Sequence, residues 1–472
     1  MATTSSELGT LPSTPPEAWE PLLRIARLAG KPLERFLRIE AASGMLLLLA
    51  SAVALGWANS SWSEGYRQFW RTPLAVRVGA FAFERTLEWV VNDGLMVVFF
   101  FVVGMEIRRE IHNGELSEWR RAVLPVTAAM GGMVAPAGAY LMLAGAGATH
   151  SGWGVPMATD IAFAVGILTL LGKRVPAALR VLLLALAVID DLGAIVVIAL
   201  FYSSGVAFGG LVIAAFGFGG IVVMQRFGVR AKVAYCIPAF VAWAGIYTAG
   251  VHPTIAGVIV GVLTPVRAWL GPEGFLTGAR NQLDRLATTS LDGLSSHELA
   301  ETLNQVDRAR REAMSPAEGL IEALHPWVAF GIMPIFALAN AGVSLNGISL
   351  DATSWHLALG VAAGLVVGKP VGILLATWLT LRLGLGTLPR GLTARHLLVL
   401  GVVAGVGFTM ALFIAQLAFA DAGLLAAAKL GVLIASGAAA FFALGIGRLL
   451  LRPNEIAQAA QCADEAESST EK

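Results

Sequence analysis

The sequence predicts an all-α protein that crosses a membrane many times. Of its 472 residues, 56% are hydrophobic and only 14% are charged, whereas about a quarter of the residues in a typical soluble domain are charged. The mean hydropathy is +0.72. The apolar residues fall in long runs separated by short polar loops, which is the pattern of membrane-spanning helices.

The composition also excludes several classes of protein. The net charge is +1, and no basic patch with interleaved aromatic residues is present, so we expect no nucleic-acid partner. Cys236 and Cys462 give neither a disulfide framework nor a metal cluster. We expect no cofactor. The N-terminus lacks the pattern of a cleavable signal peptide, so the first span is expected to be an uncleaved anchor.

The chain divides into five parts in order. Residues 1–38 form a cytoplasmic tail: 1–20 are Ser/Thr/Pro-rich and expected to be disordered, and 21–38 read as a basic amphipathic helix on the membrane surface. Residues 39–267 hold spans 1 to 8, placed near 41–59, 87–107, 120–143, 155–171, 177–201, 206–225, 231–249 and 253–267. Alternation around Gly79 predicts an extramembrane β-hairpin at 72–85.

The remaining three parts follow span 8. Residues 268–318 form a long polar cytoplasmic connection, in which Ser295 and Glu298 make a capping box and Leu294 to Met314 are a candidate surface helix. Ser315, Pro316 and Glu318 predict the start of the next helix. Residues 319–450 hold spans 9 to 12, near 319–341, 356–381, 396–418 and 425–450, and 451–472 form a cytoplasmic tail.

The loops predict the orientation of the twelve spans. Lys and Arg gather in alternate loops, within 108–121, 173–180, 226–232, 382–395 and 448–452, and are absent from 143–154, 202–206, 249–252 and 342–355. By the positive-inside rule both termini are then cytoplasmic. The hairpin region conflicts mildly with this rule, since it carries Arg67, Arg71, Arg77 and Arg85 on the outer side.

Five ionisable residues lie deep in the predicted spans: Asp93, Asp160, Asp190, Asp191 and Lys369. A charged side chain at the centre of a bilayer costs roughly 2.5–3.5 kcal/mol on insertion scales, so such residues indicate a functional site. A plainer interpretation is that they pair with one another to hold helices together. Lys369 is the natural counter-charge of the two adjacent aspartates, unless its side chain reaches an interface instead.

The oxygen atoms of this group suit a hard cation. Asp190 and Asp191 are neighbours and therefore point about 100° apart on a helix, so one faces a cavity while the other faces a neighbouring helix. Carboxylates, hydroxyls and carbonyls are the ligands that sodium prefers, and Asp191, Asp190 and Thr159 supply them for transient binding. No Cys/His cluster for a soft metal lies near them.

Two spans carry sequences that interrupt a helix. Span 4 contains Pro156 followed by Thr159 and Asp160, and span 11 contains Gly405-Val406-Gly407. Interrupted helices at corresponding places in two halves indicate a transporter's binding site, with spans 3–5 and 10–12 as inverted repeats. Asp160 would then offset the positive ends of half-helices, and Lys369 the negative ends. Ordinary kinked, glycine-packed helices are the alternative.

Further charged groups lie near the ends of spans. Glu106 and Glu110 are one turn apart at the cytoplasmic end of span 2, and Glu322 begins span 9 on the same side. They are either a pH-responsive cluster or an ordinary interfacial one. His252, at the outer end of span 8, titrates near neutrality, although a lone histidine there is more often a plain interfacial residue.

At these residues the sequence resembles the NhaA-type sodium/proton antiporters of bacterial inner membranes. The strings that carry the resemblance include ATDIAFAVGIL, LALAVIDDLGAIVVIALFY, GVHPTIAGVIVG, VGKPVGI and GVGFTMALFIA, and it covers about residues 36–450. This family is itself an example of the interrupted-helix rule, so the two arguments are not independent. The connection, near 270–312, and both tails are longer than usual for the family.

The resemblance implies roles residue by residue. Asp190 and Asp191 match the paired aspartates that exchange protons for Na⁺ or Li⁺, and Lys369 matches the lysine that pairs with Asp190. Thr159 and Asp160 match residues of the interrupted span. The hairpin matches the element through which the family forms homodimers. Positions linked to the cytoplasmic funnel or to pH response match Asp93, Glu106, Glu110, His252 and Glu322.

The sequence therefore predicts a pH-regulated, electrogenic antiporter of the bacterial inner membrane. It exchanges cytoplasmic Na⁺ or Li⁺ for external H⁺ by alternating access. Two alternatives are a sodium-coupled organic-anion symporter of similar fold and an intramembrane aspartyl protease. The first needs a polar substrate pocket, which the spans do not offer. The second needs two carboxylates on different helices facing one water, and adjacent residues fit that poorly.

Overall fold

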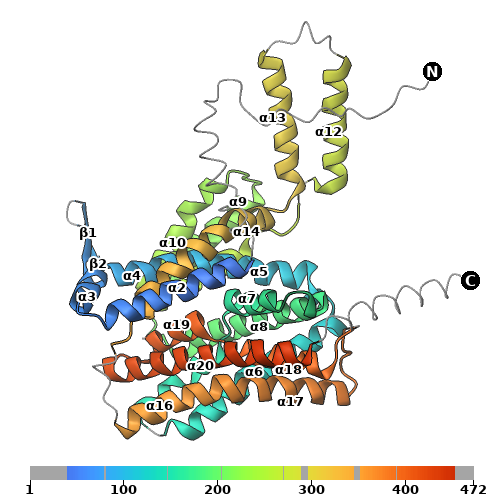
Figure 1. Ribbon diagram of the computed structural model, residues 1–472. Helices are drawn as coiled ribbons and strands as arrows, with labels where there is room; N and C mark the ends of the chain where they lie inside the picture. The colour runs from blue at the N-terminus through green and yellow to red at the C-terminus, as the bar shows by residue number, and fades with distance from the viewer. Residues whose placement is uncertain are drawn as a thin grey trace, which may run out of the picture.

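The computed structural model describes residues 40–451, apart from 79–80, 146, 204, 269, 289–295, 345–350 and 390. Helices make up most of it, and the longest ones lie alongside one another in a bundle (Figure 1). The expected surface helix 21–38, the two tails beyond 40–451 and the capping residue Ser295 lie outside the described residues.

The first half of the chain contains the hairpin and one broken helix. Its elements are α2 (Glu40–Ala58), α3 (Ser63–Arg71), β1 (Pro73–Val78), β2 (Phe81–Thr86), α4 (Leu87–Trp89), the π-helix η1 (Val90–Leu95), α5 (Met96–Asn113), η2 (Glu115–Ser117), α6 (Trp119–Leu143), η3 (Ala148–Met157), α7 (Ile161–Leu171), η4 (Gly172–Arg174), α8 (Ala177–Phe201), α9 (Phe208–Arg226), η5 (Lys232–Tyr235), α10 (Cys236–Thr248) and α11 (Thr254–Leu263).

The second half begins with a pair of helices that projects away from the bundle (Figure 1). Its elements are α12 (Gly271–Thr288), α13 (Ser296–Ala313), α14 (Pro316–Trp327), the π-helix η7 (Val328–Ile332), α15 (Met333–Asn340), α16 (Ala352–Ala363), the π-helix η9 (Gly364–Gly368), α17 (Lys369–Arg382), α18 (Ala394–Ala404), α19 (Phe408–Ala418) and α20 (Ala422–Leu450).

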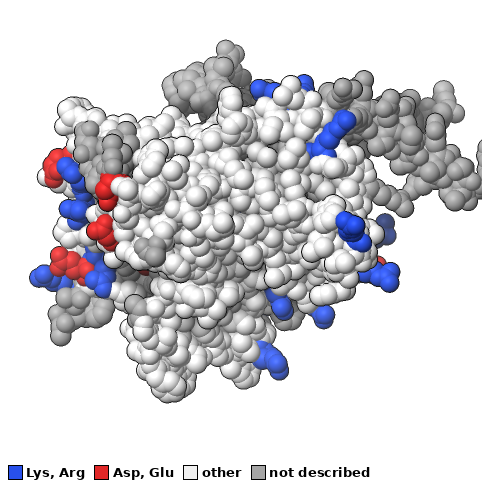
Figure 2. All heavy atoms as spheres, turned by 90° about the horizontal axis from the view of Figure 1, so that it is seen from below, with Lys and Arg blue, Asp and Glu red and all other residues white. Residues whose placement is uncertain are grey.

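The described helices establish a polytopic, all-α membrane protein. Seven of them are long and apolar enough to cross a membrane, or up to ten if each bent pair is one span. The expected interruptions are present: η3 and α7 bend by 43°, and α18 and α19 by 44°. On one face, a broad band without charged side chains separates an end where both signs occur from an end where Lys and Arg predominate (Figure 2).

The predicted hairpin is confirmed. Strands β1 and β2 are antiparallel, with Pro73 opposite Thr86 and Val78 opposite Phe81. Arg85 fixes the hairpin to the bundle, because its guanidinium hydrogen-bonds to the hydroxyl of Tyr247 in α10 and lies 5.7 Å from the ring centre of Trp89. Contacts of this kind combine a cation–π interaction with a hydrogen bond.

Several expected boundaries are also confirmed. Helix α8 spans the predicted residues, and Ser315 caps α14 in a capping box with Glu318. Helices α3, α12 and η3 were not expected, and neither were the short 3₁₀ helices η2 and η4. The region 143–154 was predicted as a loop, but most of it belongs to the 3₁₀ helix η3, which is rich in small residues and gives no apolar periodicity.

Two of the π-helices have a local cause. Both η7 and η9 end two residues before a proline, Pro334 and Pro370. Proline lacks the N–H that continues an α-helix, and its ring clashes with the carbonyl four residues earlier. The preceding turn widens by one residue to accommodate it. In η9, this wide turn ends immediately before Lys369.

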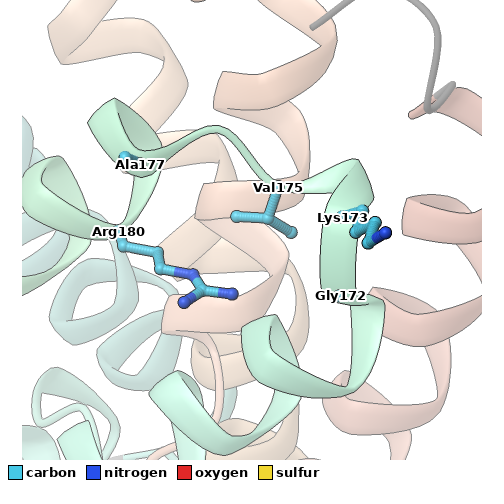
Figure 3. Close-up of a pocket in the computed structure, with 5 residues that line it drawn as sticks. All are labelled: Gly172, Lys173, Val175, Ala177 and Arg180. Atoms are coloured by element: carbon cyan, nitrogen blue, oxygen red, sulfur yellow. The ribbon is translucent and has the colours of Figure 1, made fainter. Parts of the chain in front are cut away.

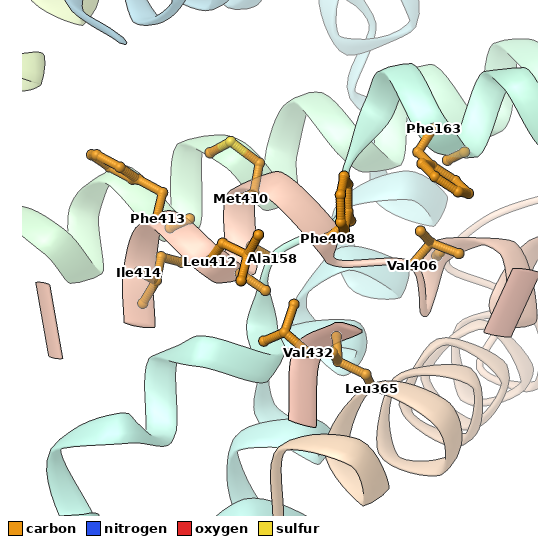
Figure 4. Packing of buried hydrophobic residues seen from close by; sticks show 14 of the residues in the cluster. Ala158, Phe163, Leu365, Val406, Phe408, Met410, Leu412, Phe413, Ile414 and Val432 are labelled. Atoms are coloured by element: carbon orange, nitrogen blue, oxygen red, sulfur yellow. The ribbon is translucent and has the colours of Figure 1, made fainter. Parts of the chain in front are cut away.

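The centre of the bundle is the second broken helix. Every residue from 399 to 415 is buried. Phe408 packs against Phe163 of the first broken helix, with ring centres 5.7 Å apart. Figure 4 shows Val406, Phe408 and Met410 surrounding the break, with Leu365 of η9 and Val432 of α20 beside them. The core therefore surrounds the point where the two broken helices meet.

Candidate ion-binding site

The aspartate pair lies inside an unbroken helix. Pro176 at the N-cap fixes the start of α8, and the apolar run that follows continues for 25 residues. Asp190 and Asp191 sit in its middle, and each is only 1% exposed. Both face protein, so they do not contact the hydrocarbon surroundings of the bundle. Helices α5, α6, α7 and α18 pack against α8 at this level.

Asp190 is held from two other helices. Its Oδ2 accepts a hydrogen bond from the hydroxyl of Thr159 at 2.7 Å and forms an ion pair with Nζ of Lys369 at 2.6 Å. Lys369 is fully buried and also donates to the carbonyl of Met157. The predicted pairing of Lys369 with Asp190 is therefore present. Snorkelling of Lys369 to an interface is wrong for this structure, because the ion pair is internal.

The carboxylate of Asp191 lacks contacts of this kind. Neither of its carboxylate oxygens has a hydrogen-bond partner among the described residues, and Oδ1 of Asp190 has none either. Buried polar atoms in proteins are nearly always paired, because an unpaired one loses its hydration without compensation. Three unpaired carboxylate oxygens on adjacent residues therefore offer ligands to a proton or a hard cation.

The two broken helices cross beside this pair. At the break between η3 and α7, the N–H of Asp160 donates to the carbonyl of Val406 at 2.8 Å, and the hydroxyl oxygen of Thr159 also lies 3.0 Å from the carbonyl oxygen of Ala404. A methyl group on Gly405 would come within 2.6 Å of the carbonyl oxygen of Leu365. Glycine is therefore needed there for the close approach of the backbone of η9 to the break between α18 and α19.

Charges complement the ends of the half-helices. Asp160 caps α7 by accepting a bond from the N–H of Phe163 at 3.0 Å, and it also accepts from the N–H of Thr409, at the start of α19, at 3.2 Å. The positive ends of two half-helices thus meet one carboxylate. Lys369 meets the C-terminal carbonyl of η3 at Met157. These are the positions expected for Asp160 and Lys369.

The expected cytoplasmic cluster does not form one unit. Glu106 of α5 lies within electrostatic reach of Asp191. Glu110 instead caps η2, since its carboxylate accepts the N–H of Glu115 at 2.7 Å. Glu322 is exposed. The structure therefore brings only Glu106 close to the aspartate pair.

Asp93 and His252 lie together at the other end of α5. Nδ1 of His252 is 3.7 Å from Oδ1 of Asp93, and its ring centre lies 5.3 Å from that of Phe413 in α19. Asp93 precedes Glu106 by thirteen residues on one helical path, which is about 20 Å. The residues expected to act in the funnel or in pH response thus lie near opposite ends of α5. No local sequence pattern indicated that Asp93 and His252 lie side by side.

The sequence also missed two residues near the centre. The hydroxyl of Thr409 donates to Oδ2 of Asp160. A polar residue immediately after an interrupted span is the signal that could have found it. Lys429, in the apolar run of α20, is buried and lies within electrostatic reach of Glu88, which accepts a hydrogen bond from Gln416 at 3.1 Å. A lone Lys within a predicted span is the signal that could have found Lys429.

No group of three or more His, Cys, Asp or Glu side chains that could hold a metal ion occurs in the described part of the chain. The aspartate pair and the hydroxyl of Thr159, which binds Asp190, offer only oxygen atoms, and such ligands suit a hard cation.

Charged groups enclosed by apolar helices, at the crossing of two broken helices, are characteristic of a membrane transporter. Comparison with known proteins gives the same class. The chain belongs to the Na⁺/H⁺ antiporter 1 family, whose model matches residues 34–446. The members of that family are transporters and not enzymes. These transporters work without a cofactor.

Relatives match over nearly the whole chain. A protein of Myxococcus xanthus (strain DK1622) named Na(+)/H(+) antiporter NhaA 2 is 70% identical over 97% of this chain and 97% of its own length. One of the same name from Sorangium cellulosum (strain So ce56) is 57% identical over 98% and 99%. The Na(+)/H(+) antiporter NhaA of Janthinobacterium sp. (strain Marseille) is 48% identical over 92% and 97%.

Proposed function

We propose that this protein exchanges cytoplasmic Na⁺, or Li⁺, for external H⁺ by alternating access. The observation that carries the proposal is the carboxylate of Asp191. It is buried in mid-helix with neither oxygen hydrogen-bonded within the described chain, beside an Asp190 that Lys369 and Thr159 hold. Such oxygens bind either protons or a hard cation, and the two compete for the same atoms.

That competition makes the exchange obligatory. Facing the cytoplasm, the deprotonated site binds Na⁺ through Asp191, Asp190 and Thr159. Facing outward, protons displace the ion, and the protonated form returns. Lys369 takes part because it forms an ion pair with Asp190. When Na⁺ binds the Asp190 carboxylate, this ion pair breaks, and the ammonium of Lys369 can then release a proton.

The exchange is electrogenic in this proposal. Two protons entering for each Na⁺ leaving move one net positive charge inward. A membrane potential of 100 mV, negative inside, then contributes about 2.3 kcal/mol to the extrusion of each Na⁺.

The proposal includes twelve crossings of the bacterial inner membrane with both termini in the cytoplasm. Besides the seven long helices, the two broken pairs, α2, α10 and α11 occupy the expected positions of the other five spans. The similar bends of 43° and 44° support inverted repeats over spans 3–5 and 10–12. The excess of Lys and Arg at one end supports the orientation (Figure 2). The membrane parts 39–267 and 319–450 then flank the cytoplasmic connection 268–318.

Regulation by pH and dimerisation complete the proposal. Glu106, within electrostatic reach of Asp191, is the residue best placed to relay cytoplasmic pH to the site. Glu110, Glu322, Asp93 and His252 contribute from the two membrane surfaces. The hairpin offers unpaired strand edges to a second copy of this chain, and a two-stranded ribbon gains stability from such pairing.

A protease is disfavoured by the same contacts. Such chemistry would pair Asp191 with a carboxylate from another helix. Asp160, at the start of α7, does not suit this role, because its two oxygens already accept hydrogen bonds from Phe163 and Thr409. The test of antiport is dye-reported proton release from acidified everted vesicles when Na⁺ or Li⁺ is added across a pH series. Proton release on addition of Na⁺ or Li⁺ supports antiport. Absence of any release at every pH contradicts it.

A further inference from the structure

A pocket of about 360 Å³ lies where α7 ends and α8 begins. Its lining includes the cations Lys173 and Arg180 and no acidic residue, and Figure 3 shows both side chains at its edge. Neither cation has a carboxylate within 4.0 Å among the described residues. Five other arginines in the same part of the chain do form such pairs. The Nε of Arg180 is buried and has no hydrogen-bond partner there.

The local backbone places both cations on the lining of one pocket, with Val175 between them (Figure 3). Gly172 adopts φ +61°, a conformation that L side chains rarely adopt, and the short helix η4 then turns the chain toward Pro176. Helix α8 starts there without a side-chain cap. Its first N–H groups and the positive end of its dipole point toward the same end of the bundle. The pocket is therefore electropositive from two sources.

An apolar strip continues from the pocket along the bundle. Val181 and Leu184 follow Ala177 on one face of α8, and they are 44% and 42% exposed. Leu170, near the end of α7, is 53% exposed. A free phosphate ion would contact only the cations. A phospholipid would cover the cations with its phosphate and the strip with its acyl chains.

We propose that this pocket binds the phosphate headgroup of an anionic phospholipid from the cytoplasmic leaflet. The inference rests on the membrane orientation proposed above, in which Lys173 and Arg180 lie at the cytoplasmic surface. Basic pockets between helices on that side suit such headgroups. A lipid bound here would link the start of α8 to the end of α7. Helix α8 carries the proposed ion-binding residues Asp190 and Asp191.

The experiment uses the purified full-length protein in neutral detergent. Native mass spectrometry measures binding of phosphatidylglycerol and of phosphatidylcholine with the same acyl chains. The wild type is expected to prefer phosphatidylglycerol, and the double variant Lys173→Gln/Arg180→Gln to bind it about fivefold more weakly for each cation removed. The matched control, Arg226→Gln/Lys232→Gln, removes two exposed cations at the same membrane side and should keep the preference.

Three further arms decide the assignment. Lys173→Arg/Arg180→Lys should retain binding, which separates charge from misfolding. Val181→Ser/Leu184→Ser should weaken both lipids. Displacement of the lipid by millimolar inorganic phosphate would identify a free-anion site and overturn the proposal, as would equal losses in pocket and control variants. None of these measurements involves transport, so their failure and the failure of antiport are separate results.

Discussion

Asp160 and Thr409 join the two halves of the chain at the level of the ion site. The carboxylate of Asp160 accepts hydrogen bonds from both the N–H and the hydroxyl of Thr409, although 249 positions separate the residues. One residue starts α7 and the other lies in the first turn of α19. The two broken helices are therefore bonded through charge as well as through packing.

Replacing Asp191 with Asn should abolish exchange without preventing membrane insertion. The amide occupies the same volume but neither titrates nor carries the charge that binds Na⁺. Proton release in everted vesicles measures the loss, and the amount of protein in the membrane measures insertion. The control Asp421→Asn changes an exposed helix cap on α20 and should leave exchange near wild type. Undiminished exchange in the Asp191 variant would refute the assignment.

Removing one partner of the Lys369–Asp190 pair should destabilise the fold strongly. Lys369→Met leaves a buried carboxylate without its ammonium, and loss of a partner in such a pair costs about 3–5 kcal/mol. Thermal unfolding in detergent measures this. The double variant Lys369→Met/Asp190→Asn removes both charges and should recover part of the stability, while exchange stays lost. A double variant less stable than the single one would contradict this account of the pair.

The hydroxyl of Thr409 should be worth a charge-assisted hydrogen bond. Thr409→Val keeps the shape of the side chain but removes the donor to Asp160, which should lower stability by about 1.5–3 kcal/mol. Thr409→Ser keeps the hydroxyl and serves as the control. Unfolding midpoints and the Na⁺ concentration for half-maximal exchange measure the two effects. Equal behaviour of Val and Ser would show that the bond contributes nothing.

The contact between η9 and the break in the second broken helix should not tolerate a methyl group at Gly405. An added Cβ would lie 2.6 Å from the backbone oxygen of Leu365, which no side-chain rotation relieves. Gly405→Ala should therefore separate the helices and reduce exchange severely. Gly437→Ala, on α20 with open space around it, is the control and should be neutral or stabilising by up to about 1 kcal/mol. Normal exchange with Gly405→Ala would show that the close approach is dispensable.

Exchange should weaken as the medium becomes acidic. Protons and Na⁺ compete for the Asp190 and Asp191 carboxylates, so acidification raises the Na⁺ concentration needed for half-maximal exchange. At saturating Na⁺, the maximal rate should change less than the half-maximal concentration. Initial rates in everted vesicles over a matrix of pH and Na⁺ concentration measure this. A half-maximal concentration that does not change with pH would exclude competition at a common site.

Local patterns were enough to predict elements whose signals are local. The limits of α8 follow from a continuous apolar run after Pro176, the hairpin from alternation, and the start of α14 from the Ser315 capping box. That Lys369 pairs with the adjacent aspartates was also predictable, because few buried charges were present to choose from, whereas the choice of Asp190 came from the family resemblance. Each of these predictions depends either on the sequence of one segment or on the small number of buried charges that could pair.

Contacts between distant segments were not predictable in this way. The bond from Thr409 to Asp160 and the proximity of His252 to Asp93 depend on how helices are placed in space, which no local pattern records. The helix η3 lacks apolar periodicity and was mistaken for a loop. Whether Glu106 or Glu110 lies near the aspartates also depends on the position of α5 along its axis relative to α8, since the two residues share one face of α5.

The wide turn of η9 determines where the buried ammonium of Lys369 points. It adds one residue immediately before Lys369, and Pro370 is the reason it is there. One residue corresponds to a rotation of about 100° around a helix. Reverting that turn to ordinary winding would swing Lys369 away from α8 while leaving the amino-acid content of the span almost untouched. The ion pair between Lys369 and Asp190 thus depends on the direction in which Lys369 leaves its helix, and the one extra residue in the π-helical turn sets that direction.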